Sequence, residues 1–576
     1  MLPLQLDVIK GSDLPDPVDT RLVVIANACQ TVGETLDHYR LTATDPDVLE
    51  QNNNHYLDRY VSMIPQLDGQ RREIIDAVNH SRSAAGVESF VSEHNSCSLN
   101  GVYLFDLLRR HGYANRVELV DNIDFEADRA RDLVRATDVV LLSSTFITSA
   151  ATIVRVVKVL KDWNPAVKVI VGGAKLTQFA HESEIHEAAR VADALVLSPN
   201  GERTMLAAIG RLFRGESLTD LPNLALDDGS GFLRTRSDPH DGLDLNADAV
   251  RWDELPPYVL RSSVNIRTGR GCPFKCKFCT FPSYNDQKVD LMSVDTVISQ
   301  LRRIMRSPST RSVRFVDDTL FLNKKHLISV CQGMMDIGFD RPWTAYLRST
   351  TLTAECTRYL RDAGCQLVLV GVESADQQVL DNMLKGTKEA HNWAAAQNLR
   401  DNGILGFAFI LTGFPGETAK SVDKTIDFLN NSGIHSYVHS PLFVFPNSPV
   451  AREAQNFGLS GGFNDWRHLT MDCRQAIDEC SRIFTEVTNA AYIDRGSSVT
   501  KILLDHGYSV DEVTRLGILH NSLAREELAG GQRQDTLDRF RRLACDATGA
   551  TGAVDEFTSP YRRTGETPQI NSSARY

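Results

Sequence analysis

The sequence predicts an α/β protein in which two parallel sheets follow one another along the chain and a helical segment comes last. Short apolar runs rich in β-branched residues alternate with amphipathic runs of helical period, and this alternation occurs twice in the 576 residues. Such alternation is typical of parallel sheets joined by crossover helices. A chain of this length is too long for a single hydrophobic core, so several domains are expected.

The first alternation predicts a doubly wound domain over residues 1–225. Helical patterns at 101–113 and 151–163 separate the strand-like runs, and the first of these ends at a glycine. A long insertion, 27–100, leaves the C-terminal end of the first strand, so we expect it to cap the ligand face of this domain. The expected strands are 22–26, 117–121, 138–144, 168–174 and 194–197.

Three of these strands end in small polar residues. In doubly wound sheets, ligands bind beyond the carboxyl ends of the strands. These ends are therefore expected to seat a broad, phosphate-bearing ligand. The candidate residues are Ser143, Ser144, Thr145, Gly172, Gly173, Ser198, Pro199, Asn200, Gly201 and Glu202.

The second alternation, 261–455, predicts a partial barrel of six βα units. A segment rich in Asp, Gly and Pro, 226–260, is expected to link it to the first domain. Residues 456–547 predict a helical C-terminal domain that shapes the substrate pocket, and the polar tail 548–576 is expected to be disordered. The expected barrel strands are 264–268, 312–318, 343–348, 366–374, 406–413 and 436–445.

One loop at the start of this barrel carries Cys272, Cys276 and Cys279 in a CxxxCxxC spacing. A [4Fe–4S] cluster ordinarily takes four thiolates, so a loop that supplies three leaves one iron open to bind something else. Zinc is the alternative metal. Structural zinc, however, needs four ligands, and no second knuckle or nearby histidine follows Cys279.

At these cysteines, and with the aromatic Phe278 before the last of them, the chain resembles the radical S-adenosylmethionine (SAM) superfamily. The resemblance implies that the cysteines hold a [4Fe–4S] cluster and that SAM binds the open iron. It also implies reductive cleavage of SAM to a 5′-deoxyadenosyl radical, with electrons from a flavodoxin or ferredoxin-like donor. The cofactor would then carry the hard chemistry, and the protein would supply position and shielding.

Several polar residues at the ends of the barrel strands are candidates for binding SAM, because the chemistry of a parallel barrel gathers at those ends. Glu373 and Ser374 belong to a Gly-x-Glu-Ser string similar to the family motif that contacts SAM. Asp317 is a further strand-end candidate. Arg348 suits the SAM carboxylate, since a guanidinium pairs well with a planar carboxylate, but a salt bridge to Asp317 or Glu373 is equally compatible.

The order of the two domains resembles the branch of this superfamily in which a Rossmann-like cobalamin-binding domain precedes the radical SAM domain. Here Ser198-Pro-Asn-Gly-Glu202 stands where the family has a Gly-Glu-rich motif. The DxHxxG signature is absent, so no histidine is expected to bind cobalt. Methylthiotransferases are disfavoured, because their first domain supplies three cysteines whereas this one has only Cys29 and Cys97.

The resemblance implies a cobalamin-dependent radical SAM methyltransferase that acts on an unactivated carbon of a small metabolite or natural-product precursor. One SAM would methylate cob(I)alamin and a second would yield the radical. A radical rearrangement, cyclisation or ring contraction without methyl transfer is the first alternative. A cobalamin-free radical SAM enzyme with a vestigial first domain and a cobalamin or redox sensor are the others.

Composition excludes several classes of partner. A net charge of −12 and a pI near 5.7, without a basic run, argue against nucleic-acid binding and favour a small-molecule or peptide substrate. No signal peptide or long apolar stretch is present, so we expect a cytoplasmic protein that does not bind membranes. The scattered cysteines give no disulfide framework, which agrees with a reducing compartment.

Overall fold

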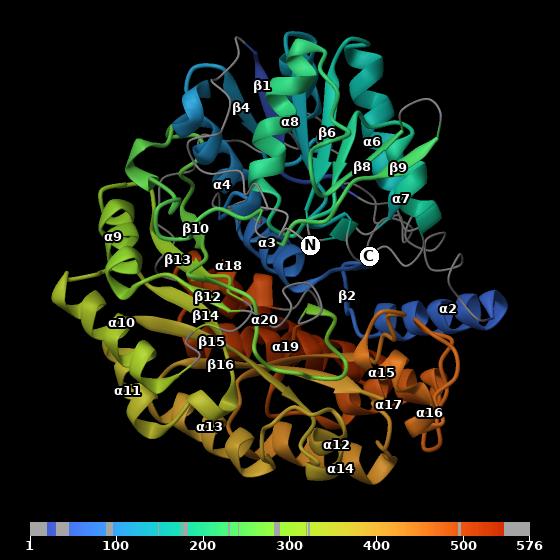
Figure 1. The fold of residues 1–576 in the computed structure, drawn as a ribbon. Helices are drawn as coiled ribbons and strands as arrows, with labels where there is room; N and C mark the ends of the chain where they lie inside the picture. Colours follow the sequence, from blue (N-terminus) through green and yellow to red (C-terminus); the bar gives the residue numbers. More distant parts are fainter. Residues whose placement is uncertain are drawn as a thin grey trace. The chain divides into compact units, whose positions relative to one another are not determined.

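The computed structural model forms two compact units (Figure 1). The first comprises residues 1–42, 97–259 and 557–576, and the second comprises 43–96 and 260–556. The predicted tail and part of the predicted insertion lie outside the described residues. The structure describes residues 20–29, 45–87, 91, 96–147, 149–173, 175–176, 182–227, 231–239, 241–281, 289–317, 320, 323–493 and 497–546.

A seven-stranded sheet forms the core of the first unit. Its strands are β1 (Leu22–Ile25), β4 (Val117–Val120), β5 (Val139–Ser143), β6 (Lys168–Gly172), β7 (Ala194–Val196), β8 (Leu224–Asp227) and β9 (Phe232–Arg234), in the spatial order β4-β1-β5-β6-β7-β8-β9. The five predicted strands are all present and pair in parallel, with β4 at the edge and β1 between β4 and β5. The doubly wound prediction is confirmed.

The helices of this unit follow the predicted periodicity. They are α4 (Leu99–Leu108), continued by a π-helical turn η2 (Arg109–Tyr113), then α5 (Ala127–Arg135), α6 (Ala150–Trp163), α7 (Glu182–Ala189), α8 (Glu202–Arg214) and the short η4 (Trp252–Glu254). Ser149 caps α6 by accepting the N–H of Thr152. At the predicted glycine stop, Gly112 takes a left-handed φ of 95°.

The predicted linker is partly ordered. Strands β8 and β9, which overlap the start of 226–260, extend the first sheet as an antiparallel ribbon. Further along the same segment, the carboxylate of Asp241 accepts the N–H of Thr204 at 2.8 Å and an N–H of Asn223 at 2.9 Å. The linker therefore differs from the prediction, because its residues hydrogen-bond to the first unit.

A second seven-stranded sheet, in which all neighbouring strands are parallel, forms the barrel of the second unit. Its strands are β10 (Ser263–Ile266), β13 (Ser312–Phe315), β14 (Trp343–Leu347), β15 (Cys365–Glu373), β16 (Leu405–Thr412), β17 (Ser436–Pro441) and β18 (Ala491–Tyr492), which lie side by side in chain order. Six of them were predicted. The seventh, β18, comes from the predicted helical domain and pairs in parallel with β17.

Crossover helices lie along one face of this sheet (Figure 1). They are α9 (Val294–Met305), α10 (Lys324–Asp336), α11 (Ala354–Asp362), α12 (Gln377–Asn382), α13 (Glu389–Asp401) and α14 (Ala419–Asn431), with a 3₁₀ turn η6 (Ser349–Thr351) before α11. A Cβ on Gly406 of β16 would lie 3.1 Å from a methyl of Leu399 in α13. That close approach explains the glycine in an otherwise bulky strand.

The opposite face of the sheet packs on the last three helices of the chain, α18 (Ser497–Asp505), α19 (Val510–Leu528) and α20 (Gln534–Asp546). Three other helices, α15 (Pro449–Arg452), α16 (Ala454–Phe457) and α17 (Cys473–Glu486), lie between β17 and β18 in the chain. Leu367, Leu369 and Phe407 of the sheet share one buried cluster with side chains of α18, α19 and α20. The C-terminal segment is helical, as predicted, but it closes the barrel rather than standing as a separate domain.

Most of the described insertion, residues 45–87, belongs to the second unit, whereas we predicted the whole insertion as part of the first domain. It consists of α2 (Pro46–Ser62), a hairpin of β2 (Gln66–Leu67) and β3 (Gln70–Arg71), and α3 (Ile74–Ala84). Ile74, Ile75 and Val78 join the cluster of α18 to α20, and Asn52 donates to the carbonyl of Asn464 at 2.7 Å. The apolar face of α3 thus packs on the C-terminal helices, far along the chain.

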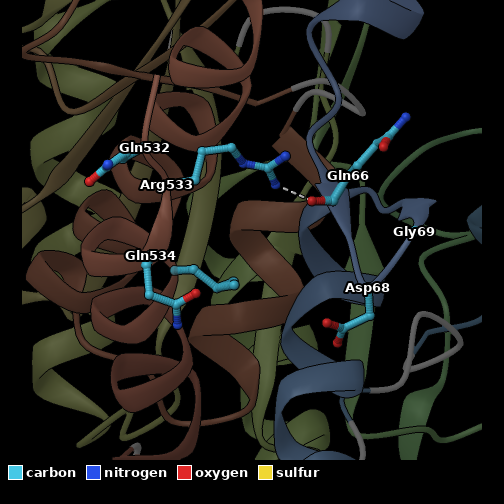
Figure 2. A pocket seen from close by; sticks show the side chains of 7 residues that line it. Gln66, Asp68, Gly69, Gln532, Arg533 and Gln534 are labelled. Carbon is cyan, nitrogen blue, oxygen red and sulfur yellow. Dashed lines mark hydrogen bonds between the residues drawn. The ribbon is translucent and has the colours of Figure 1, made fainter. Parts of the chain in front are cut away.

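The hairpin and the turn before α20 line a surface hollow of about 430 Å³ (Figure 2). Its lining is mostly polar and exposed, and Arg533 bonds across it to the carbonyl of Gln66. The cysteine loop contributes none of its lining residues. We therefore place the chemistry elsewhere.

Candidate active site

The cysteine loop leaves the end of the first barrel strand. A short ladder, β11 (Gly269–Arg270) with β12 (Asp290–Leu291), brackets it. Lys277, between the second and third cysteines, anchors the loop through its backbone: its N–H donates to the carbonyl of Met383 at 2.9 Å and its carbonyl accepts the N–H of Val450 at 2.9 Å. The loop is therefore held from both sides by elements of the barrel.

The three predicted ligands differ in exposure. Cys276 is buried, and Cys272 and Cys279 are half-buried. The pKa of Cys279 is raised to about 11, mainly because the thiol is buried and also because Cys276 and Cys272 lie near it, while a backbone hydrogen bond at Phe281 and the Lys385 ammonium oppose the rise. The three thiols are therefore close enough to affect one another's ionisation. A bound metal cluster would offset the repulsion between their thiolates.

The arrangement of the three cysteines suits an iron–sulfur cubane better than a single metal ion. Within the described ranges, no three His, Cys, Asp or Glu side chains converge closely enough to hold one metal ion. A zinc site requires such convergence of four ligands. In a cubane each thiolate binds a different iron, so the sulfurs stand further apart. The residues present fit a cluster held by Cys272, Cys276 and Cys279.

Arg348 lies against the cluster loop. Its guanidinium stacks 3.7 Å from the ring centroid of Phe274, and Nη1 is 3.9 Å from the sulfur of Cys276. Nη2 donates to the carbonyl of Lys385 and to Thr387 Oγ1. Its hydrogen-bond partners among the described residues are thus a sulfur, a carbonyl and a hydroxyl. The alternative of a salt bridge to Asp317 or Glu373 is not what these contacts show.

Glu373 forms a buried ion pair with Lys385. The two side chains are 12% and 8% exposed, and Lys385 Nζ lies 2.8 Å from Glu373 Oε1. A register shift of β15 against β16 and a left-handed φ of 63° at Glu373 turn its carboxylate toward the lysine. A Cβ on Gly371 would lie 2.6 Å from that oxygen, so the pair requires glycine there.

Lys385 is a candidate site residue that strand-end reasoning missed. Its ammonium also lies 5.5 Å from the ring centroid of Phe278, so it links the cluster loop to the Glu373 strand end. The signal was present in the sequence, since Leu384-Lys-Gly-Thr387 follows the Gly-x-Glu-Ser string.

Two predicted SAM residues have their polar groups turned to the backbone. Oδ1 of Asp317 accepts the N–H groups of Thr268 and Gly269 at 2.7 and 2.6 Å, and burial raises the pKa of this carboxyl to about 6. The hydroxyl of Ser374 accepts the N–H of Asp376 at 3.2 Å, at the start of α12. Both residues therefore shape the site by fixing turns.

In the first unit, the structure brings the three predicted strand ends together. Strands β5, β6 and β7 are neighbours, and Ser143 pairs with Gly172, which pairs with Val196. The hydroxyl of Ser143 accepts an N–H of Asn100 at 2.5 Å and bonds Thr145 Oγ1 at 3.0 Å. These polar groups lie at one carboxyl edge, as doubly wound topology requires.

Two glycines make room at this edge. Gly173 has a φ of 128°, and a Cβ there would lie 2.9 Å from Ser144 Oγ and from the N–H nitrogen of Thr145. A Cβ on Gly201 would lie only 2.3 Å from a methyl of Val196. The Ser144 hydroxyl is buried and has no hydrogen-bond partner among the described residues, so it is available to a ligand in this cradle.

The last predicted loop leads into a helix. Gly201 is the N-cap of α8, Glu202 is its first residue and is buried, and the N–H of Asn200 donates to Ser198 Oγ at 3.3 Å. Pro199 lies in the same turn. A half-buried helix start beside small polar turns suits a phosphate or amide tail.

Comparison with known proteins bears on both units. Residues 266–429 match the model of the radical SAM superfamily. The chain contains a radical SAM domain. This domain begins within β10 and ends within α14, so it contains the cysteine loop, Arg348, Glu373 and Lys385. The prediction of a radical SAM enzyme is confirmed at these residues.

Relatives extend the similarity beyond the radical SAM domain. An uncharacterized methyltransferase of Pyrococcus horikoshii is 24% identical over 428 residues, which are 72% of this chain and 91% of that protein. The anaerobic magnesium-protoporphyrin IX monomethyl ester cyclase of Rubrivivax gelatinosus is 26% identical over 338 residues, 56% of this chain and 60% of that one. The chain thus spans less than two thirds of the cyclase.

The fold is similar to that of a solved radical SAM methyltransferase, TsrM from Kitasatospora setae, whose structure has cobalamin and a [4Fe–4S] cluster bound. The TM-score is 0.55 at 16% identity, and the match covers 78% of this chain and 97% of that one. This confirms the predicted order of a doubly wound unit followed by a partial barrel. Among the described residues, no helix is long and apolar enough to cross a membrane.

Proposed function

We propose that this protein is a cobalamin-dependent radical SAM methyltransferase that acts on an unactivated carbon of a small metabolite or natural-product precursor. One observation carries the proposal. Three cysteines on a doubly anchored loop lie beside Arg348 and the Lys385–Glu373 pair, at the ends of barrel strands. A preceding doubly wound unit, with a polar cradle at its strand ends, supplies the place for a second cofactor.

In the barrel, Cys272, Cys276 and Cys279 would hold the cluster and leave one iron to SAM. Arg348 and Lys385 place two cations next to these thiolates, which offsets part of the negative charge of a thiolate-bound cluster. Glu373, fixed by Lys385, presents its remaining oxygen for a hydroxyl or ammonium of SAM. When bound, the cluster and SAM supply a 5′-deoxyadenosyl radical, and cobalamin supplies a transferable methyl group.

In the first unit, we assign the cobalamin seat to the three strand-end loops. Gly172, Gly173 and Gly201 keep side chains out of the cradle, and the hydroxyls of Ser144 and Ser198 can bond amide groups of a ligand. The remaining predicted residues, Ser143, Thr145, Pro199, Asn200 and Glu202, line or shape the same edge.

A radical cyclisation or rearrangement is the second candidate, and the similarity to the Rubrivivax cyclase favours it. The same residues would hold the same cofactors in either reaction. A cobalamin-free enzyme with a vestigial first unit is the third. We also propose a flavodoxin or ferredoxin-like electron donor and a cytoplasmic location, since a partly exposed cluster requires reducing conditions.

The test is anaerobic purification with iron, sulfide and hydroxocobalamin supplied, followed by metal analysis of the wild type, the Cys272/Cys276/Cys279→Ala triple variant, and a Cys331→Ala control. About four irons and one cobalt are expected in the wild type and in the control. The triple variant should lose the iron and keep the cobalt. Iron without cobalt would refute the cobalamin assignment and leave the third candidate.

Product analysis then separates the first two candidates. With dithionite and SAM, a cobalamin-dependent methyltransferase should form S-adenosylhomocysteine as well as 5′-deoxyadenosine. A cyclase or rearrangement enzyme should form 5′-deoxyadenosine alone. The absence of both nucleosides from protein that holds its iron would refute an enzyme of this class.

A further inference from the structure

The α18 helix carries a lysine into the interior of the barrel. Lys501 is 6% exposed, and its Nζ lies 3.5 Å from the hydroxyl of Tyr346 and 4.9 Å from the centroid of that ring. Tyr346 is on β14 and faces the same side of the sheet as Leu369 and Phe407, which pack on the C-terminal helices. Lys501 therefore lies on the inner face of the sheet.

Two charged side chains, Asp505 and Arg314, lie near this ammonium. The carboxylate of Asp505, one turn further along α18, is bound by Arg314 of β13 at 2.5 Å, and both side chains are 10% exposed. Arg314 disfavours the positive charge on Lys501, and Asp505 favours it. The hydrogen bond to Tyr346 is long and has a neutral acceptor. Among the described residues, the ammonium therefore has a neutral hydrogen-bond partner and no ion pair.

An aromatic wall adjoins the ammonium. The rings of Tyr346 and Phe409 are stacked, with centroids 6.2 Å apart and planes at 16°, and both side chains are half-buried. Along β14, Tyr346 precedes Arg348 by two residues, so their Cα atoms are about 6.7 Å apart and their side chains share a face. Arg348 contacts the sulfur of Cys276. The two rings therefore lie about two residues along the strand from the side chain that contacts the cluster loop.

We propose that Lys501, Tyr346 and Phe409 form a substrate subsite for an organic anion with a planar apolar body. The ammonium would pair with the anionic group, and the two rings would contact the planar part. The rest of the molecule would then extend toward Arg348 and the cysteines. The proposal deepens the proposed function and rests on it, because it names the class of substrate that the radical would meet.

Burial gives an independent reason to expect such a ligand. Desolvation lowers the pKa of Lys501, which shows that the site holds the charged form at a cost. A bound carboxylate would offset that cost, because a charge-assisted hydrogen bond in a poorly solvated site is strong. If Lys501 served packing alone, its replacement by methionine would not change the affinity for an anionic ligand.

The test uses benzoate as the probe and benzyl alcohol as its neutral counterpart. Binding to the anaerobically reconstituted protein is measured by saturation-transfer NMR titration in the wild type, Lys501→Met and Lys501→Arg. Lys158→Met, which removes an exposed lysine of the first unit, is the matched control. Methionine keeps the length of the side chain and removes a desolvated charge, so this variant should fold.

We expect Lys501→Met to weaken benzoate binding by roughly tenfold or more, which corresponds to one lost charge-assisted hydrogen bond. Lys501→Arg and the control should bind benzoate as the wild type does. Benzyl alcohol should bind the wild type and Lys501→Met alike. Equal benzoate affinity in the wild type and Lys501→Met, or no saturable benzoate binding to the wild type, would overturn the subsite.

The metal content of the same preparations keeps the two proposals apart. If the protein holds full iron and cobalt but benzoate binds the wild type and Lys501→Met equally, the subsite is overturned and the proposed function stands. Binding that depends on Lys501 in protein that takes up neither metal supports the anion site and overturns the proposed function.

Discussion

The Asp317 carboxylate should control the stability of the cysteine loop. Its Oδ1 accepts the N–H groups of Thr268 and Gly269, which lie just before the loop, and it also accepts the Thr268 hydroxyl at 3.3 Å. Asp317 is 4% exposed and Thr268 is 2% exposed, so water does not reach these donors. Removing the carboxylate leaves the backbone donors buried and unsatisfied.

The size of the effect follows from those two donors. An unsatisfied buried donor costs about 1–3 kcal/mol, so Asp317→Ala should cost about 2–6 kcal/mol. Asp317→Asn keeps an acceptor oxygen in the same place and removes the burden of a buried carboxylate. Its cost should be within about 1 kcal/mol, because a neutral hydrogen bond replaces a charge-assisted one.

Hydrogen–deuterium exchange of peptides spanning 268–281 reports the local opening of this segment. Asp317→Ala should speed their exchange by roughly 30-fold or more, and reconstituted iron should fall in parallel. Asp317→Asn and the surface control Asp340→Ala should resemble the wild type. Wild-type exchange in Asp317→Ala, or equal losses in the alanine and asparagine variants, would show that these hydrogen bonds do not hold the loop.

Three further predictions concern buried charges and a tight glycine. Lys385→Met should destabilise the second unit by about 3–5 kcal/mol in denaturant unfolding, because it leaves the buried Glu373 carboxylate without a cation. Adding Glu373→Gln should restore most of the lost stability. No restoration would argue against the ion pair. Burial raises the pKa of Glu417 from 4.5 to about 8, so the folded state holds this proton more tightly than the unfolded state. The stabilisation from Glu417 should be complete below pH 4.5 and lost as pH rises through 8, by on the order of 5 kcal/mol at most, and the melting temperature of Glu417→Gln should lack this part of the pH dependence. Gly173→Ala should lower cobalt content without lowering iron, whereas Gly215→Ala, also at positive φ but with open space around it, should keep both metals; equal cobalt in the two variants would contradict the cradle.

Most of the fold could be predicted from local patterns. The β-branched runs at 22–26 and 168–174 became β1 and β6 because a run buried on both faces of a parallel sheet must be apolar throughout. The order of the two sheets followed from the order of those runs. Local sequence patterns were enough to predict these strands, because each strand pairs with another strand from the same run of alternating strands and helices.

The partner of an amphipathic segment could not be predicted in the same way. The periodicity of Ile74, Ile75 and Val78 shows that α3 has an apolar face, but it does not say what covers that face. Its partners on α19 and α20 lie more than 400 residues further along the chain. The same limit applies to β18, whose two residues are too few to carry a strand pattern.

The candidate site divides along a similar line. Residue type and strand-end position located Asp317, Arg348 and Glu373 correctly in the barrel mouth. They could not reveal orientation, which depends on tertiary contacts. Asp317 turns back to Thr268 and Gly269, whereas Glu373 turns toward Lys385 because a bulge and a positive φ redirect it.

Two buried charged groups in the barrel each have a partner of opposite charge, and Lys501 differs from them. Burying a charge costs several kcal/mol unless a partner offsets the loss of water. Glu373 has Lys385, and Asp505 has Arg314. Lys501 is equally buried, and the partner that the structure gives it is a neutral phenol at 3.5 Å. A buried ammonium that lies beside two stacked aromatic rings and has no ion pair among the described residues is stabilised most directly by a bound anion.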